Sequence, residues 1–242
     1  MKFKESRMVV LGDSYVTPNY LVDARDSFWG LLANDLNITE IDNYACNRFS
    51  LDSIIHILLN EDIDFNRHIV IGIPPIMRES IYIENRGHRH PKHKIVDWEI
   101  TEHDVSSMEN VTNYHFHNRY NNDYEKVNLF SSEWHEVMTL EKIYLIYNYL
   151  KSKNAKFMIL NMSKPFQYQV LWPAGMNIIK QVALLEECNI FKDTYQSINQ
   201  DDGIKPVDFD TYDWMGHHGA EGNLNYYQKV VKPMVEKLGW FS

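Results

Sequence analysis

The sequence predicts an α/β fold in which a mostly parallel β-sheet is covered by helices on both faces. Short apolar runs of the kind found in buried parallel strands recur along the chain, and amphipathic segments with helical spacing lie between them. Because strands that alternate with helices build parallel sheets, this pattern indicates a sheet with crossover helices on its two faces.

Three of the predicted strands, at 8–11, 69–73 and 157–161, are short apolar runs. In chain order the predicted strands cover 8–11, 38–43, 69–73, 157–161 and 189–192. The first is the clearest, because its run MVVL ends abruptly at Gly12.

The helices are predicted from apolar residues that fall on one side of a 3.6-residue period. They cover 27–37, a segment around 54–59, 138–150, 176–187 and 223–238. Ser50 lies in the expected N-cap region of the second helix. Pro233 interrupts the last helix and should kink it, because proline removes one backbone donor.

The periodic pattern fails from about 78 to 136, where the sequence is polar, aromatic and rich in His and Asn. So long a connection is unusual inside a compact domain and is often a lid or a binding loop. We therefore predict a single domain over 1–242 with an insertion or lid at about 78–136. We expect most of its aromatic residues to pack the insertion onto the domain, the alternative being a surface that contacts sugar rings or an acyl chain.

Six of the eleven histidines lie in the same segment: His88, His90, His93, His103, His115 and His117. Their clustering raises a transition-metal site as an alternative. However, no cysteine lies among them, and Pro91 with the nearby Lys and Arg residues favours a solvated loop. We therefore predict no metal site and no cofactor.

The charge balance excludes some partners. The chain has 24 Lys and Arg against 33 Asp and Glu, a formal net charge of −9. Such a chain does not resemble a nucleic-acid binder with a basic surface or a protein with a polybasic membrane anchor. The 44% hydrophobic and 13% aromatic composition is enough to build a core, which excludes a disordered chain.

Two cysteines, Cys46 and Cys188, are too few for a disulfide-rich scaffold and are expected to be reduced thiols. The apolar run at 8–11 is too short for a signal-peptide core. No stretch approaches the roughly 20 apolar residues of a membrane span. We therefore expect a soluble, cytoplasmic protein.

The residues that follow the predicted strands are the natural place to look for chemistry, because ligands bind at the carboxyl ends of parallel strands. The first strand runs into Gly12-Asp13-Ser14. Gly12 permits a tight turn in which Ser14 is exposed, and a serine held there can act as a nucleophile if a base reaches it. Alternatively, Asp13 or Ser14 only caps the next segment.

A second polar motif, DTYDWMGHHGAEGNLNYY, lies immediately before the last predicted helix. It holds carboxylates, glycines and the pair His217 and His218. A histidine in such a loop can be a general base with its second nitrogen held by an aspartate. Alternatively, this is a surface loop whose histidines contact the helix terminus.

Together the two motifs resemble the SGNH, or GDSL-type, hydrolase family. In that family GDS ends the first strand, and a catalytic His precedes the last helix with a Gly five residues after it, as His217 and Gly222 do here. The stretches SFWGLLANDLN and NYACNRFSLDSII resemble the family's first helix, second strand and following loop. The resemblance covers both ends of the chain and the strand order, but not 78–136.

The resemblance implies a three-layer α/β/α sandwich with a mostly parallel, five-stranded, flavodoxin-like sheet. It also implies an esterase. Ser14 would attack the acyl carbon, and His217 would take the serine proton and return it to the leaving alcohol. The substrate would be a small-molecule or glycan ester, such as an O-acetylated carbohydrate. The spacing to Gly222 favours His217 as the base, so His218 would point elsewhere, for example toward substrate.

Three of the family's positions differ in this chain, and the first two concern the triad acid and the second block. The triad acid usually lies three residues before the His, where Trp214 stands. Asp213 is therefore the candidate acid, with Asp210 in reserve. The family's second-block Gly aligns with Arg48, which is compatible with the role because the oxyanion donor there is a backbone N–H.

The third-block Asn of the family, in Gly-x-Asn-Asp, is absent, since the chain reads Gly72-Ile73-Pro74-Pro75. Pro74 offers neither a side-chain amide nor a backbone N–H. Losing one oxyanion donor typically costs about 10²–10³ in rate. Asn47 or Arg78 could supply the missing donor. If neither does, the protein is a weak enzyme or a non-catalytic binding protein on the same fold.

Overall fold

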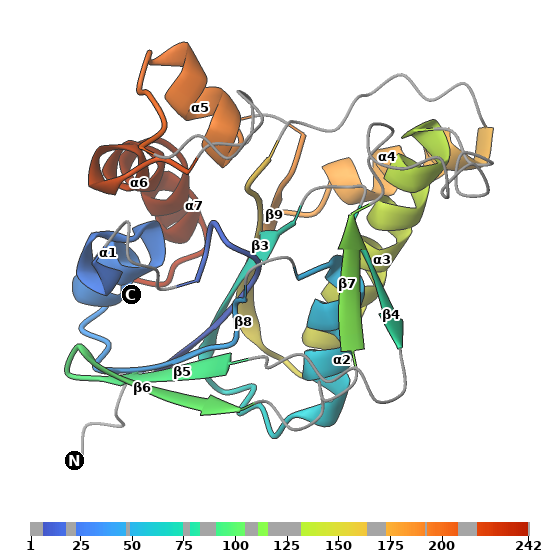
Figure 1. Cartoon of the computed structure of the whole chain (residues 1–242). Coiled ribbons are helices and arrows are strands. Elements are labelled where there is room, and N and C mark those ends of the chain that lie inside the picture. The colour runs from blue at the N-terminus through green and yellow to red at the C-terminus, as the bar shows by residue number, and fades with distance from the viewer. Residues whose placement is uncertain are drawn as a thin grey trace.

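The computed structural model describes residues 7–17, 23–46, 49–74, 78–82, 91–104, 111–115, 132–163, 173–191, 193–207 and 217–241. Its central sheet has the strand order β6-β5-β2-β1-β3-β8-β9 within these ranges (Figure 1). The strands are β1 (Arg7–Leu11), β2 (Glu40–Asn43), β3 (His68–Ile73), β5 (Pro91–Val96), β6 (Glu99–Asp104), β8 (Lys156–Asn161) and β9 (Cys188–Asn189).

Five neighbouring strands of this sheet, β2, β1, β3, β8 and β9, run parallel. Counted among themselves they follow the 2-1-3-4-5 order of flavodoxin-like folds. The predicted α/β fold with a mostly parallel sheet is therefore confirmed. The chain reverses its direction of winding beside β1, so the sheet's switch point lies between β1 and β3.

The sheet has seven strands rather than the predicted five, because the segment expected to be an irregular insertion adds a hairpin to it. β5 pairs antiparallel with β2, and β6 pairs antiparallel with β5. Asp97 and Trp98 turn the hairpin with φ of 50° and 69°. In the same segment β4 (Arg78–Tyr82) and β7 (Val111–His115) form a separate antiparallel pair.

Charged side chains fasten the hairpin to β2. Lys92 Nζ lies 3.2 Å from the Asp42 carboxylate and donates to the hydroxyl of Tyr44 at 2.8 Å. Two residues further along β5, Lys94 forms an ion pair with Glu40 of β2 at 3.3 Å. Because these strands carry lysines where buried strands carry Val or Ile, an apolar pattern could not identify them.

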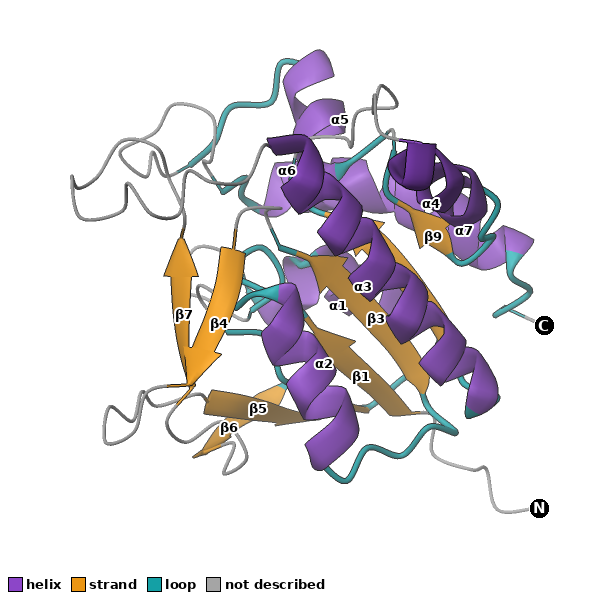
Figure 2. Ribbon diagram, turned by 90° about the vertical axis from the view of Figure 1, so that its right-hand side faces the viewer, coloured by secondary structure: helices purple, strands orange, loops and turns teal. Residues whose placement is uncertain are grey.

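Helices cover both faces of the parallel strands (Figure 2). One face is covered by α2 (Leu51–Asn60), α3 (Ser132–Ser152) and α4 (Pro173–Ala183), and the other by α1 (Phe28–Asp35), α6 (Ala220–Tyr226) and α7 (Lys232–Lys237). Two short elements, η1 (Ala24–Asp26) and α5 (Tyr195–Asp201), were not predicted. Ser50 caps α2, as expected, in a reciprocal hydrogen-bonding arrangement with Ser53.

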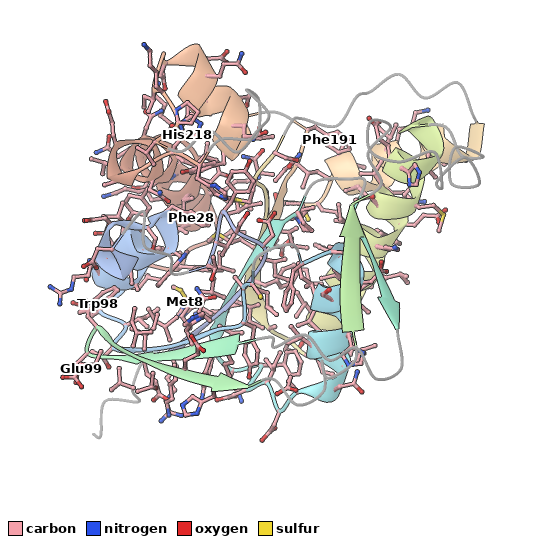
Figure 3. The ribbon with its side chains drawn as sticks, in the orientation of Figure 1. Met8, Phe28, Trp98, Glu99, Phe191 and His218 are labelled. Carbon is pink, nitrogen blue, oxygen red and sulfur yellow. The ribbon has the colours of Figure 1, made fainter. Side chains whose placement is uncertain are left out.

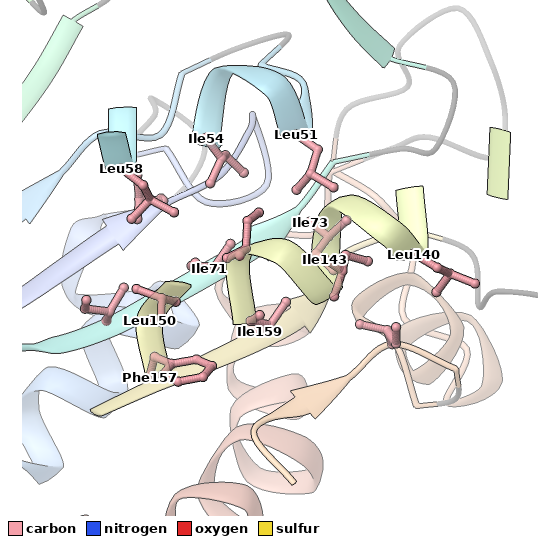
Figure 4. Packing of buried hydrophobic residues seen from close by; sticks show 14 of the residues in the cluster. Leu51, Ile54, Leu58, Ile71, Ile73, Leu140, Ile143, Leu150, Phe157 and Ile159 are labelled. Carbon is pink, nitrogen blue, oxygen red and sulfur yellow. The ribbon is translucent and has the colours of Figure 1, made fainter. Parts of the chain in front are cut away.

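The strand residues divide between two hydrophobic cores. Alternate residues of β1 such as Val9 and Leu11 pack with α2 and α3, while Met8 and Val10 pack with α1. Figure 4 shows the first core, in which leucines and isoleucines of α2 and α3 meet the side chains of β3 and β8. In β1, β3 and β8 every residue after the first is buried, which explains why these sequences read as continuous apolar runs.

The C-terminal helical stretch is longer and less regular than predicted. It begins at Ala220, before the expected start at 223, and passes through a π-helical turn at Tyr227–Val231 before Pro233. The amide of Lys232 bonds to the carbonyl of Tyr227, five residues back. This wide turn lies where proline interrupts the helical hydrogen bonds, so the irregularity precedes Pro233. No helix in the described ranges combines the length and apolar character needed to cross a membrane.

Candidate active site

The turn after β1 carries Ser14 at the carboxyl end of the strand. The backbone amides of Val16 and Thr17 both donate to the carbonyl of Asp13 at 3.0 Å, and the amide of Tyr15 donates to the Asp13 carboxylate at 3.2 Å. Asp13 is completely buried, whereas Ser14 keeps part of its surface exposed. The chain therefore leaves the sheet in one internally bonded turn that presents a partly accessible serine.

Two glycines let this turn fold closely over the switch point. A Cβ atom at Gly12 would lie 2.7 Å from Cγ2 of Val16, and a Cβ atom at Gly72 would lie 2.3 Å from the same atom. Real side chains do not approach so closely. Glycine at both strand ends is therefore what allows Val16 to pack over β1 and β3.

Neighbouring elements hold the turn from outside. The carbonyl of Val16 accepts one hydrogen bond from Trp29 Nε1 at 2.8 Å and another from Asn43 Nδ2 at 3.1 Å. The amide of Cys46 donates to the carbonyl of Gly12 at 3.2 Å. The Ser14 turn is thus tied to α1 and to the loop after β2.

His217 lies beside this turn. Its ring contacts the ring of Tyr15 at a centroid distance of 4.8 Å and an interplanar angle of 41°. Its carbonyl accepts the amide of Val207 at 2.8 Å. Because Tyr15 follows Ser14 directly, the structure brings the segments of the predicted nucleophile and the predicted base together from opposite ends of the chain.

His218 is built into the protein interior. His218 lies beside α5 and α6 (Figure 3). Its side chain is buried, and its ring meets the ring of Tyr195 edge-on at a centroid distance of 5.5 Å. Burial lowers the pKa of His218, the nearby charge of His217 acts in the same direction, and a hydrogen bond with the backbone of Lys205 opposes them. His218 is therefore a buried side chain that packs against Tyr195, and the example of a contact with substrate finds no support in the described residues.

The glycine five residues after His217 also has a packing reason. A Cβ atom at Gly222 would lie 2.3 Å from Cβ of His218 and 3.1 Å from Nδ2 of Asn199. Only glycine lets α6 pack this closely against the preceding loop.

Sequence reasoning missed three residues that organise the site: Tyr195, Gln196 and Asn223. The Tyr195 hydroxyl donates to the carbonyl of His218 at 3.0 Å, and Gln196 Nε2 donates to the hydroxyl of Tyr15 at 2.6 Å. Asn223 Nδ2 donates to the same His218 carbonyl at 3.3 Å. All three act through contacts between distant segments, which leave no local pattern.

The ends of β3 and β8 carry Pro74 and Asn161. Pro74, at the position of the absent third-block Asn, is buried after β3. Asn161 at the end of β8 donates to the carbonyl of Ile190 at 3.0 Å and accepts the amide of Ser163 at 3.0 Å. These bonds use the Asn161 side chain to join β8 to the strand beside it.

Several predicted site residues lie outside the described ranges. They are Asn47, Arg48, Asp210 and Asp213, together with Trp214. The backbone of Arg78 belongs to β4, but its side chain is not described.

The clustered histidines are only partly described. His93 lies 3.6 Å from Glu102, and burial lowers its pKa, while the Glu102 charge opposes this. Across the described part of the chain, no three His, Cys, Asp or Glu side chains are grouped in a way that could hold a metal ion. His88, His90 and His117 lie outside it.

Neither Cys46 nor Cys188 forms a disulfide, as expected. Burial raises the pKa of the Cys188 thiol well above its ordinary value, which makes it a poor nucleophile.

Comparison with known proteins identifies the fold. A carbohydrate esterase, whose active site is reported to have divergent catalytic and non-catalytic binding functions, superposes with a TM-score of 0.50 at 12% identity. The alignment covers 99% of this chain and 71% of that one. The fold is similar to that of this carbohydrate esterase. The shared feature is a mostly parallel sheet flanked by helices.

Two further structural neighbours have lower TM-scores. An acetyl xylan esterase from the rumen bacterium Butyrivibrio proteoclasticus is 12% identical with a TM-score of 0.48, over 99% of this chain and 66% of that one. A member of the lipolytic G-D-S-L family from Veillonella parvula is 11% identical with a TM-score of 0.43, over 94% of this chain and 97% of that one. No family model and no curated protein sequence matches the chain.

Proposed function

We propose that the protein is a serine-dependent hydrolase that cleaves an acyl ester through an acyl-enzyme on Ser14. The ring contact between Tyr15 and His217 carries this proposal, because it joins the Ser14 turn to the loop of the histidine base. The position of the turn beside the switch point of the sheet supports it further. The esterases with a similar fold are consistent with this chemistry.

In the proposed reaction His217 takes the proton of the Ser14 hydroxyl while its oxygen attacks the acyl carbon. The tetrahedral intermediate collapses when the same proton passes to the leaving alcohol. Water then attacks the acyl group on Ser14, with His217 again as base, and the acid is released. Asp213, or Asp210 in its place, would orient the imidazole and stabilise its charged form.

The oxyanion would be bound by the Ser14 amide and by the amide of Arg48 in the loop after β2. Pro74 cannot supply the usual third donor, so Asn47 or Arg78 would have to reach the oxyanion. The proposed substrate class is an O-acetylated carbohydrate, because a short acyl group needs the least space in the site.

The decisive experiment combines turnover with active-site labelling. We expect the wild-type protein to hydrolyse p-nitrophenyl acetate and to release acetate from acetylated xylan, with both activities lost in Ser14→Ala and His217→Ala. A fluorophosphonate should add one label, and the labelled peptide should contain Ser14. Ser163→Ala is the matched control and should keep activity, because Ser163 is buried in the interior after β8. A folded wild-type protein that takes no label would refute the proposal.

A non-catalytic binding protein is the second candidate, and buried Pro74 at the oxyanion position favours it. It predicts that acetylated oligosaccharides bind equally well to wild type and to Ser14→Ala in calorimetric titrations, with no acetate released from either.

A further inference from the structure

Two consecutive residues at the start of α5 contact the two segments that meet at the candidate site. Tyr195 donates from its hydroxyl to the carbonyl of His218, next to the proposed base. Gln196 donates from Nε2 to the hydroxyl of Tyr15, next to the proposed nucleophile. The rings of Tyr15 and Tyr195 also lie 5.7 Å apart. α5 therefore touches both segments within one turn of helix.

The start of α5 is well anchored. Thr194 is fully buried and accepts the amide of Ser197 as the N-cap of the helix. Tyr195 and Gln196 are buried as well. Because both side chains are buried and hydrogen-bonded, the start of α5 holds them in fixed positions beside the candidate site.

Tyr15 connects the start of α5 to the imidazole of His217. The hydroxyl of its side chain accepts the hydrogen bond from Gln196 at 2.6 Å, and its ring packs against the ring of His217 at a tilt of 41°. Tyr15 itself is only 9% exposed. Because the hydroxyl end of Tyr15 is held by this hydrogen bond, its ring stays in place and restricts the movement of the His217 imidazole.

We infer that Tyr15 and Gln196 are positioning residues of the proposed esterase: Gln196 fixes the Tyr15 ring, and that ring holds the His217 imidazole in its place beside the Ser14 turn. The inference rests on the proposed function. Tyr15 acts through its contact with the His217 ring, and Gln196 acts through Tyr15. Misplacement of a catalytic group by about 1 Å can lower a rate by about 10²-fold.

The kinetic test separates the ring from the hydroxyl. Tyr15→Leu removes the ring that packs against His217, and it should lower kcat by about 10²-fold, with KM changed by less than about threefold. Tyr15→Phe keeps the ring and should lower kcat only about five- to tenfold. Gln196→Leu should have the same effect as Tyr15→Phe. The double variant Tyr15→Phe with Gln196→Leu should have the same kcat as either single variant, because both substitutions remove the same hydrogen bond.

Gln200→Leu, one turn further along α5 on its exposed surface, is the control and should leave kcat unchanged. The second measurement is the NMR spectrum of the His217 ring protons, assigned by their loss in His217→Gln. These resonances should move in Tyr15→Leu and stay near their wild-type positions in Tyr15→Phe, because the tyrosine ring shields them through space.

The outcomes separate the inference from the function. If the wild type hydrolyses esters and a folded Tyr15→Leu keeps wild-type kcat and unmoved His217 resonances, the positioning role is refuted while the esterase stands. Additive losses in the double variant would also refute it. If the wild type neither turns over nor takes the fluorophosphonate, both the function and the positioning role fail.

Discussion

Asn223 accepts a hydrogen bond from the backbone amide of Phe28 at 3.0 Å, although 195 residues separate the two in the sequence. The other end of the same side chain donates to the carbonyls of His218 and Gly219 and to the hydroxyl of Tyr195. One buried amide therefore joins the first turn of α1 to the loop before α6. This loop carries His217, so the link bears on both stability and the site.

Asn223→Ala should lower the free energy of unfolding by about 2–4 kcal/mol. The substitution leaves the buried amide of Phe28 unsatisfied, which costs about 1–3 kcal/mol. It also removes the side-chain hydrogen bonds to the carbonyls of His218 and Gly219, each worth about 0.5–1.5 kcal/mol, although both carbonyls keep another donor. The check is urea unfolding followed by tryptophan fluorescence. Asn225→Ala is the matched control two residues along the same helix, where the amide bonds to Asp202 near the surface. Equal losses in the two variants would contradict the linking role of Asn223.

Gly222→Ala should destabilise the protein by about 1–2 kcal/mol, although alanine favours helices. The gain in helix propensity is at most about 1 kcal/mol, while overpacking typically costs about 1–3 kcal/mol. The added Cβ would lie 2.3 Å from Cβ of His218, so the loop must shift. We therefore expect esterase activity to fall as well. Glu221→Ala, on the exposed side of the same turn, should change stability by less than about 0.5 kcal/mol. A Gly222→Ala protein more stable than wild type would show that α6 and the loop do not pack as described.

The strands β1, β3 and β8 could be predicted because burial imposes an apolar residue at nearly every position, as Val9 and Ile71 illustrate. β2 and β9 give a weaker signal, because β2 carries Asp42 and Asn43 and β9 has only two, half-buried residues. The β5–β6 hairpin could not, because it is held by ion pairs such as Lys92 with Asp42, which look like a solvated segment in the sequence. α5 was missed for a related reason. Its seven residues are mostly polar, and Thr194 stabilises it through a cap rather than through an apolar stripe.

The candidate site shows the same division. Ser14, His217 and Gly222 stand out because turns and helix starts restrict which residues fit there. Tyr15, Gln196 and Asn223 do not, because their partners are distant in the sequence, and tyrosine, glutamine and asparagine are unremarkable in any local pattern. The identity of the triad acid stays a prediction, since Asp213 and Asp210 lie outside the described residues.

Gly72→Ala should be destabilising by about 1–3 kcal/mol in wild type and by clearly less in a Val16→Ala background. The reason is that the new Cβ would meet Cγ2 of Val16 at 2.3 Å, and Val16→Ala removes that atom. The measurement is a double-mutant cycle of unfolding free energies. Simple additivity of the two substitutions would mean that Val16 does not pack over Gly72.

His68 should make the protein less stable at acid pH. Burial lowers the pKa of His68 from 6.5 to about 4, the charge of Lys156 acts in the same direction, and a hydrogen bond with the Arg7 backbone opposes both. Between these two pKa values the unfolded chain binds a proton that the folded protein does not. The free energy of unfolding therefore falls as the pH drops from about 6.5 toward about 4, and no such loss arises above about 6.5.

His68→Phe removes this titration and keeps a ring against Trp240, which packs on His68 at a centroid distance of 4.8 Å. At about pH 8 the difference between variant and wild type reports packing alone, because His68 is neutral in both states of the wild type. From there to about pH 4.5 the wild type should lose about 2 kcal/mol more stability than His68→Phe. Some acid sensitivity should persist in the variant, since His93 and His218 also have lowered pKa values. Parallel pH profiles of the two proteins would show that His68 is protonated as readily in the folded protein as in the unfolded chain.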